Sequence, residues 1–111
     1  MTTITLFTNQ TTSGSSAVFR PNSLTKDQIL AGIKPFFTIN GTLGAGTIDL
    51  EIQNPDGSFS STGLDDEEEI DANIPGVFEV NYSDEMLLRL TISGADGSTN
   101  ISAYAKYCKD E

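Results

Sequence analysis

The sequence predicts an all-β fold, an antiparallel β-sandwich with at most one short helix. Polar and apolar residues alternate strictly in residues 46–53, and the alternation returns in residues 77–82 and 86–92. Turn sequences punctuate these segments, Asn-Pro-Asp-Gly at 54–57 and Gly-Ala-Asp-Gly at 94–97. Period-two alternation bounded by such turns is typical of half-buried antiparallel strands. Jelly-roll and immunoglobulin-like sandwiches use the same short strands, so the sequence leaves both open.

The first part of the chain predicts one strand and a polar connection. Residues 3–8 alternate Thr-Ile-Thr-Leu-Phe-Thr and are expected to form the first strand. Residues 9–16 are polar and contain glycine, which favours a loop. Because polar Ser/Thr/Gly-rich segments often order only on a partner, residues 1–16 are a candidate arm. Residues 17–20 predict a short second strand that Pro21 ends.

Residues 24–32 are the one helical candidate. Thr25 can cap its start, with Gln28 three residues later as the partner of a capping box. Gly32 can end it, because glycine accepts the left-handed conformation that follows many helices. Such a helix is under two turns and needs tertiary support, so an irregular strand is the rival interpretation.

The remaining strands follow at the short spacing of a sandwich. They are expected at residues 35–40, 47–53, around Phe59, and at 77–82, 86–92 and 99–107, and residues 110–111 are expected to form a frayed tail. No internal repeat or break in composition divides the chain. We therefore expect one domain over residues 1–111.

The net charge of the chain excludes some classes of binding partner. It has 16 acidic and 6 basic residues, a net charge of −10. Nucleic-acid binding calls for a basic surface, and an anionic membrane repels an acidic protein. We therefore expect neither partner. The sequence shows no signal peptide and no apolar run of membrane-spanning length, so no secretory route is expected and the chain is expected to be made in the cytoplasm.

Little in the sequence points to catalysis. The chain has no histidine and one cysteine, Cys108, which we expect to be an apolar filler. Asp49 and Glu51 are two apart on a strand, a spacing far more typical of a solvated strand face than of paired catalytic acids. The glycine-rich residues 41–46 lack the lysine and the spacing of a phosphate-binding loop. We expect no enzymatic activity and no cofactor.

The acidic run at residues 65–71 has two interpretations. Several carboxylates close together can bind calcium. The run lacks the spaced acids and central glycine of a helix-loop-helix calcium loop, however, so a solvated loop or a charged edge strand is expected. No metal site is therefore assigned.

Some residues break the expected pattern of burial. Tyr104 lies on the strand face opposite Ile101, and Phe7 and Leu87 are also off-pattern. Off-pattern apolar residues can mark an interface, although a second sheet could cover them instead. With the polar face of the N-terminal strand, the candidate interface residues are Thr3, Thr5, Phe7, Leu87 and Tyr104.

Residues 39–101 carry a family resemblance. The segment contains Asn-Gly-Thr-Leu-Gly-Ala-Gly-Thr at 40–47, Asn-Pro-Asp-Gly-Ser-Phe at 54–59, Ile-Pro-Gly-Val at 74–77 and Ser-Gly-Ala-Asp-Gly-Ser at 93–98. This order of turns and strands resembles small β-sandwich virion proteins of tailed bacteriophages, in particular head decoration (cement) proteins. It covers a little over half of the chain.

The resemblance implies a non-enzymatic structural protein that binds and stabilises the exterior of a phage head. Its partner would be the major capsid protein, its own state a homotrimer, and its location the capsid surface. Two alternatives stay open: a tail or head–tail connection component, and a carbohydrate-binding β-sandwich module. The carbohydrate module would need aromatic residues lined up as a platform, and the chain has no tryptophan.

Overall fold

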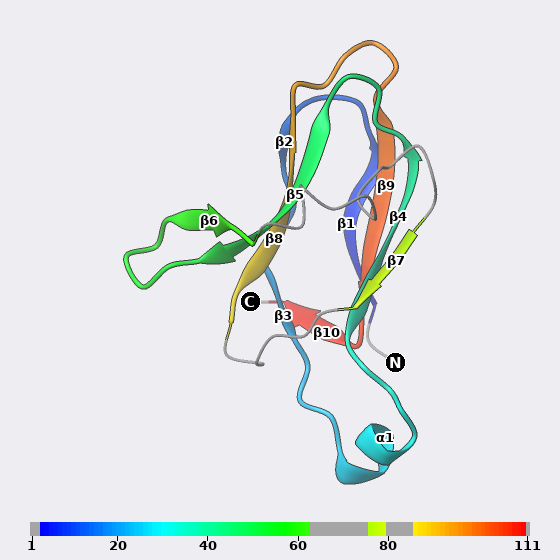
Figure 1. Cartoon of the computed structure of the whole chain (residues 1–111), viewed down its shortest axis with the longest axis vertical. Coiled ribbons are helices and arrows are strands. Elements are labelled where there is room, and N and C mark those ends of the chain that lie inside the picture. The colour runs from blue at the N-terminus through cyan, green and yellow to red at the C-terminus, as the bar shows by residue number, and fades with distance from the viewer. Residues whose placement is uncertain (1–2, 63–75, 80–85, 111) are drawn as a thin grey trace.

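The chain forms a mostly β structure in which two antiparallel sheets pack as a sandwich (Figure 1). The computed structural model describes residues 3–62, 76–79 and 86–110. Its elements, in chain order, are β1 (Thr3–Gln10), β2 (Gly14–Ser15), β3 (Phe19–Pro21), α1 (Lys26–Leu30), β4 (Phe36–Thr42), β5 (Thr47–Gln53), β6 (Phe59–Ser61), β7 (Gly76–Glu79), β8 (Leu88–Ser93), β9 (Asn100–Lys106) and β10 (Cys108–Asp110).

The strands divide between the two sheets in a mixed order. One sheet has four strands in the order β1-β9-β4-β7. The other has six strands in the order β10-β3-β8-β5-β6, with β2 also paired to β8. Connections such as β4 to β5 and β9 to β10 therefore pass from one sheet to the other. The expected antiparallel sandwich with one short helix is confirmed.

The hydrophobic core lies between the sheets, as the alternation predicts. In β8 the buried residues are Leu88, Leu90 and Ile92, and the residues between them are half-buried. β4, β5 and β9 alternate in the same way. The largest side chains that are fully buried include Phe19 and Phe37, one from each sheet. Burial of such side chains stabilises a fold by roughly 1.5–3 kcal/mol each.

One end of the sandwich is closed by hydrogen bonds between two turns. Asp96, before β9, accepts hydrogen bonds from the backbone N–H of Ala45 at 2.9 Å and of Ser98 at 2.8 Å. Thr99 is buried, and its hydroxyl donates to the carbonyl oxygen of Leu43 at 2.8 Å. Gly44 has a positive φ of 69°, and a Cβ there would collide with the Asp96 carboxylate. The turn sequences therefore fix the β4–β5 and β8–β9 connections to each other.

Several strand boundaries differ from the sequence expectation. Within the loop expected at residues 9–16, β1 continues to Gln10 and residues 14–15 form β2, which pairs with β8. The strand expected at 17–20 is β3 at 19–21, and Pro21 belongs to it, opposite Cys108. Tyr107 has a positive φ of 56° and separates β9 from β10, so the chain crosses to the other sheet there. Residues 108–110, whose end was expected to fray, instead pair with β3, Asp110 opposite Phe19. The predicted strand at 77–82 is described only at residues 76–79, and the acidic run at 65–71 lies outside the described residues.

Candidate interaction surface

Three of the predicted interface residues share the outer face of the four-stranded sheet. Thr5 lies opposite Tyr104, and Tyr104 lies opposite Thr38 on the next strand. Thr3 lies opposite Lys106 in the adjoining row. Thr3 and Thr5 are exposed and Tyr104 is half-buried. The register therefore brings these three residues together.

The other two predicted interface residues are elsewhere. Phe7 is only 4% exposed and belongs to the hydrophobic core, so the expectation that it lies outside the core is wrong. The reason is a register shift between Thr5 and Phe7, which lets Leu6 and Phe7 both be buried. Leu87 precedes β8 in the other sheet, where its carbonyl accepts a hydrogen bond from the N–H of Gln53 at 2.9 Å.

Part of the candidate arm at residues 1–16 is a strand of the sandwich and not a free segment. Residues 3–10 form β1, which pairs with β9 along its length. Leu6 and Phe7 are buried, and Ile4 packs against the core. In this chain the first strand therefore contributes to the sandwich, whatever it contacts in an assembly.

The connection between β3 and β4, residues 22–35, is a surface feature that sequence reasoning did not assign to an interface. We call it the finger. It contains α1 and extends from the lower end of the sandwich (Figure 1). None of its residues is buried, and α1 contributes nothing to the core. Ile29 is 62% exposed and Leu30 is 75% exposed.

The finger is nevertheless held by complete caps at both ends of α1. Gln28 N–H donates to the Thr25 hydroxyl at 3.2 Å, and Thr25 N–H donates to the Gln28 side-chain oxygen at 2.8 Å. This is the predicted capping box. At the other end Ile33 N–H donates to the Gln28 carbonyl and Gly32 N–H to the Ile29 carbonyl, both at 3.0 Å. With Gly32 at a φ of 79°, this is a Schellman motif.

Basic residues gather at the end of the sandwich that carries the finger. Lys26 and Lys34 lie in the finger, Lys106 lies in register with Phe36, and Lys109 lies opposite Arg20. The sixth basic residue, Arg89, forms an ion pair with Glu51. We call the first five residues the basic pole. Among the residues whose side chains the structure describes, the acids at this end are Asp27 and Asp110.

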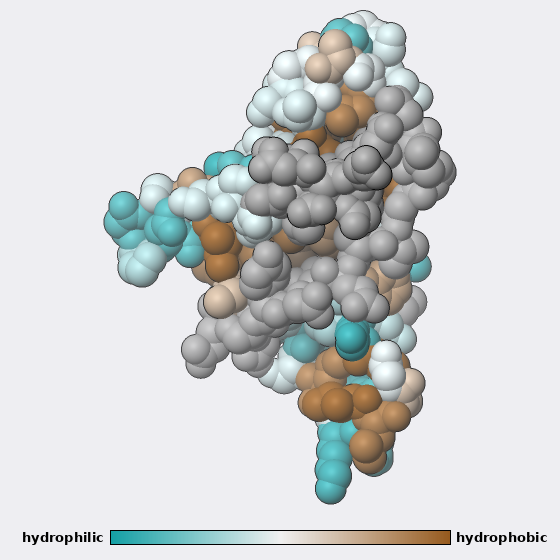
Figure 2. Space-filling view, viewed as in Figure 1, coloured by the Kyte–Doolittle hydropathy of each residue, from teal (hydrophilic) through white to brown (hydrophobic). Residues whose placement is uncertain are grey.

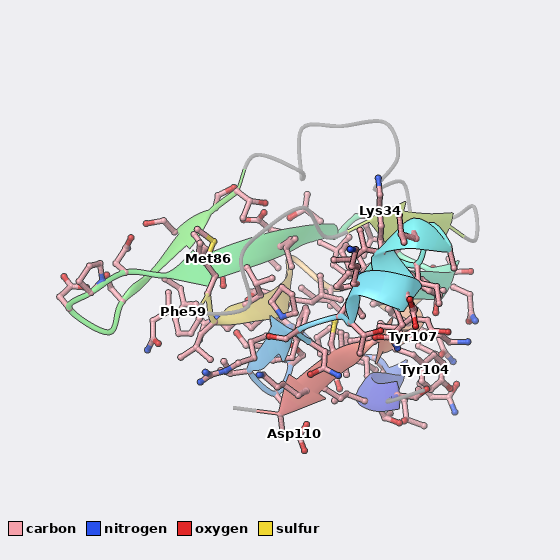
Figure 3. The ribbon with its side chains drawn as sticks, turned by 90° about the horizontal axis from the view of Figure 1, so that it is seen from below. Lys34, Phe59, Met86, Tyr104, Tyr107 and Asp110 are labelled. Carbon is pink, nitrogen blue, oxygen red and sulfur yellow. The ribbon has the colours of Figure 1, made fainter. Side chains whose placement is uncertain are left out.

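Apolar and aromatic side chains accompany the basic pole. Figure 2 shows hydrophobic residues gathered over the lower end of the molecule, around the finger. The rings of Phe36 and Tyr107 are 6.1 Å apart with an interplanar angle of 49°. Viewed from below, Lys34 lies beside α1, and Tyr104 and Tyr107 lie towards β1 and β10 (Figure 3). This end therefore combines positive charge with exposed apolar surface.

The acidic pair singled out in the sequence belongs to a structural network. Glu51 Oε1 accepts hydrogen bonds from Arg89 Nε at 2.8 Å and from the Thr91 hydroxyl at 2.6 Å. Burial raises the pKa of Glu51, but hydrogen bonds from Thr91 and Arg89 and the charge of Arg89 outweigh it, so the pKa lies below its ordinary value. Asp49 accepts a hydrogen bond from the Ser61 hydroxyl. A general acid at neutral pH needs a raised pKa, the opposite of Glu51.

Arg89 also ties the β5–β6 hairpin to the sandwich. Its guanidinium carbon lies 3.8 Å from the centre of the Phe59 ring, a cation–π contact. Figure 3 shows Phe59 and Met86 together on this side of the molecule, away from Tyr104. Arg89 therefore couples β8 to both strands of the hairpin.

Within residues 3–62, 76–79 and 86–110, no three potential ligands among His, Cys, Asp and Glu converge on a metal-binding position. No helix in these ranges is long and apolar enough to cross a membrane. The acidic run at 65–71 lies outside these ranges. Its two interpretations, a calcium site and a solvated loop or charged edge strand, therefore stay predictions.

Three comparisons with known proteins were negative. A scan against protein-family models, a search of curated proteins and a search of solved structures each found no match.

Proposed function

We propose that this chain is a non-enzymatic structural protein of a tailed-phage virion, a capsid decoration protein that binds the exterior of the head. The proposal combines the sequence resemblance with the finger. One observation carries it: the finger is fully capped at both ends, yet it buries no residue and exposes Ile29 and Leu30. The finger has a fixed conformation but does not pack into the core of this chain. We therefore infer that its conformation serves contact with a partner.

The chemistry of this end defines the partner's surface. An interface needs apolar side chains that become fully desolvated, surrounded by polar groups that fix orientation. Ile29 and Leu30 supply the apolar centre, and Lys26 and Lys34 lie within a few residues of them along the finger. The partner surface should therefore be acidic and carry an apolar depression. We propose that the major capsid protein provides it.

The acidic charge outside the basic pole is suited to a capsid surface that carries many copies of this chain. The chain as a whole is strongly acidic, whereas five of its six basic residues lie at the proposed docking end. Net charge far from zero keeps closely spaced copies soluble. A homotrimeric state and location on the capsid surface belong to the same proposal.

The two alternative functions can be compared with the same surface of the molecule. A tail or head–tail component would use the same kind of contact surface on a different partner. For a carbohydrate-binding module, the Phe36–Tyr107 pair is tilted by 49°, whereas sugar-binding aromatics need to be lined up as a platform. No observation on the described residues favours that module over a protein partner.

Co-sedimentation with empty heads prepared without this chain tests the proposal. The variant Ile29→Ser combined with Leu30→Ser should lower the affinity roughly thirtyfold, because losing an apolar hot spot costs about 2 kcal/mol. Its thermal stability should be unchanged, since α1 contains no buried residue. The matched control is Met86→Ser, which removes an apolar side chain that is 37% exposed elsewhere.

Three outcomes contradict the proposal. Wild-type protein that does not bind heads removes the decoration function, and binding to purified tails instead supports the tail alternative. Equal binding by wild type and the finger variant shows that the finger is not the docking element. Equal loss in the Met86 control shows that the effect is not specific to the finger.

A further inference from the structure

Two basic residues lie directly opposite each other on the outer face of the six-stranded sheet. Arg20 of β3 is in register with Lys109 of β10, and the next pair, Pro21 with Cys108, is fully buried. Because successive side chains of a strand point to opposite faces of the sheet, Arg20 and Lys109 face away from the core. Like charges directly opposite each other in a sheet are destabilising, so this pair lowers the stability of the free chain.

The charge of this pair is not balanced by a neighbouring acid. The chain has 16 acidic and 6 basic residues, yet within the described residues neither Arg20 nor Lys109 forms an ion pair. Asp110 follows Lys109 in the chain, but it lies opposite the buried Phe19 and therefore on the other face of β10. Figure 3 shows the side chain of Asp110 projecting away from the sandwich.

A second, independent observation concerns the guanidinium of Arg20. Its Nε atom is shielded from solvent and has no hydrogen-bond acceptor, and among the side chains that the structure describes it is the only nitrogen or oxygen atom in this state. A buried donor without an acceptor costs free energy, because its hydrogen bond to water is lost and not replaced. An acceptor that reached this Nε atom would therefore lower the free energy of the chain.

Arg89 on the neighbouring strand β8 shows which acceptor suits such a group. Arg20 and Arg89 are both half-buried on the outer face of the same sheet. The Nε atom of Arg89 donates to Oε1 of Glu51 at 2.8 Å. A guanidinium presents parallel N–H groups that match the two oxygens of a carboxylate. A carboxylate is therefore the acceptor that best fits Arg20, and Lys109 adds a second positive charge beside it.

We propose that Arg20 and Lys109 form a binding site for a carboxylate, the side chain of an aspartate or glutamate on the docking partner. The guanidinium turns about its terminal side-chain torsions, so that the Nε–H edge faces the ligand. Lys109 approaches the same carboxylate from β10, and the repulsion between the two cations is offset by attraction to a shared anion. Both side chains are half-buried, so solvent screens this contact less than it screens a fully exposed ion pair.

The identity of the partner rests on the proposed function, whereas the carboxylate site itself is testable on the free chain. Arg20 and Lys109 belong to the basic pole, but they lie on the sheet and not in the finger, which begins directly after β3. The site is therefore a second contact beside the finger, where an acidic residue of the capsid protein lies against β3 and β10. Two separate contacts fix the orientation of the docked chain, because each prevents rotation about the other.

Nuclear magnetic resonance of the isotope-labelled chain tests the site, with sodium acetate as the probe and sodium chloride at equal ionic strength as the reference. Acetate should bind saturably in the millimolar range and shift the Nε–H resonance of Arg20, whereas that of Arg89, already paired with Glu51, should not move. Arg20→Lys keeps the charge but loses the planar fork, so it should weaken acetate binding roughly tenfold. Lys109→Gln should also weaken it. Lys106→Gln, which removes a basic charge from the other sheet, is the control and should leave the affinity nearly unchanged.

Acetate that changes the spectrum no more than chloride would overturn the proposal, as would equal acetate binding by wild type, Arg20→Lys and Lys109→Gln. Phosphate that binds in the same titration where acetate does not would overturn the choice of a carboxylate. Co-sedimentation tests the partner: Arg20→Lys should lower the affinity for empty heads by a similar factor, and equal binding of heads by this variant and wild type would contradict the partner assignment. Wild type that binds acetate but no heads contradicts the decoration function alone.

Discussion

Phe7→Ala measures whether the N-terminal strand is part of the fold. The ring is 4% exposed and belongs to the core formed by both sheets. Replacing a buried phenylalanine with alanine costs about 3–5 kcal/mol, because the transfer free energy is lost and a cavity remains. A domain of 111 residues has a free energy of unfolding of about 5–15 kcal/mol. The substitution should therefore remove a large fraction of the total stability.

Urea denaturation followed by circular dichroism is the assay. With a slope of about 1.5 kcal/mol/M for a domain of this size, the midpoint should fall by roughly 2–3 M. Thr8→Ala, on the same strand at an exposed position, is the control and should change the free energy by less than about 0.5 kcal/mol. A midpoint that Phe7→Ala leaves within error of wild type would refute the reasoning and restore the interpretation of residues 1–16 as an arm.

Two further predictions concern titratable groups. Hydrogen bonds from Ser98 N–H, then from Ala45 N–H, hold the pKa of Asp96 below its ordinary value of 3.8. This stabilisation is present above the unfolded pKa and is lost as the pH falls through the lower folded pKa; Asp96→Asn should therefore lower the melting temperature at pH 7, with the difference shrinking in acid, and a constant difference would contradict the linkage. Burial raises the pKa of Cys108 to about 11, so its thiol should resist Ellman's reagent at pH 8 until urea unfolds the chain, whereas rapid labelling of native protein would contradict the burial.

Local signals predicted much of the fold correctly. The capping box at Thr25 and Gln28 and the glycine end at Gly32 are satisfied by neighbouring backbone atoms, so the sequence contains the required information. The alternation in residues 47–53 places Ile48 and Leu50 in the core for the same reason. Each depends on residues within a few positions of one another.

Features set by distant strands were not predictable. The bulge after Thr5 depends on the register with β9, about a hundred residues away, and it moves Phe7 into the core. The crossing at Tyr107 depends on β3 being available to pair with residues 108–110. A positive φ at a tyrosine has no signature in the sequence.

The candidate surface was predictable only in part. Alternation predicts that Thr3, Thr5 and Tyr104 face away from the core, and the register brings them to one face. The finger was recognised as a helix, but its exposure depends on how the β3 and β4 ends are placed, which no local pattern records. The grouping of basic residues at one end likewise requires the pairing of Lys109 with Arg20.

Hydrogen exchange of the chain, free and bound to empty heads, tests the central claim most directly. The account predicts that binding slows exchange in residues 22–35, where the finger has no burial of its own to protect it. The β5–β6 hairpin, residues 47–61, should exchange at the same rate in both states. Protection of the hairpin with no change in the finger, or no protection anywhere, would contradict the claim that this chain docks through its finger.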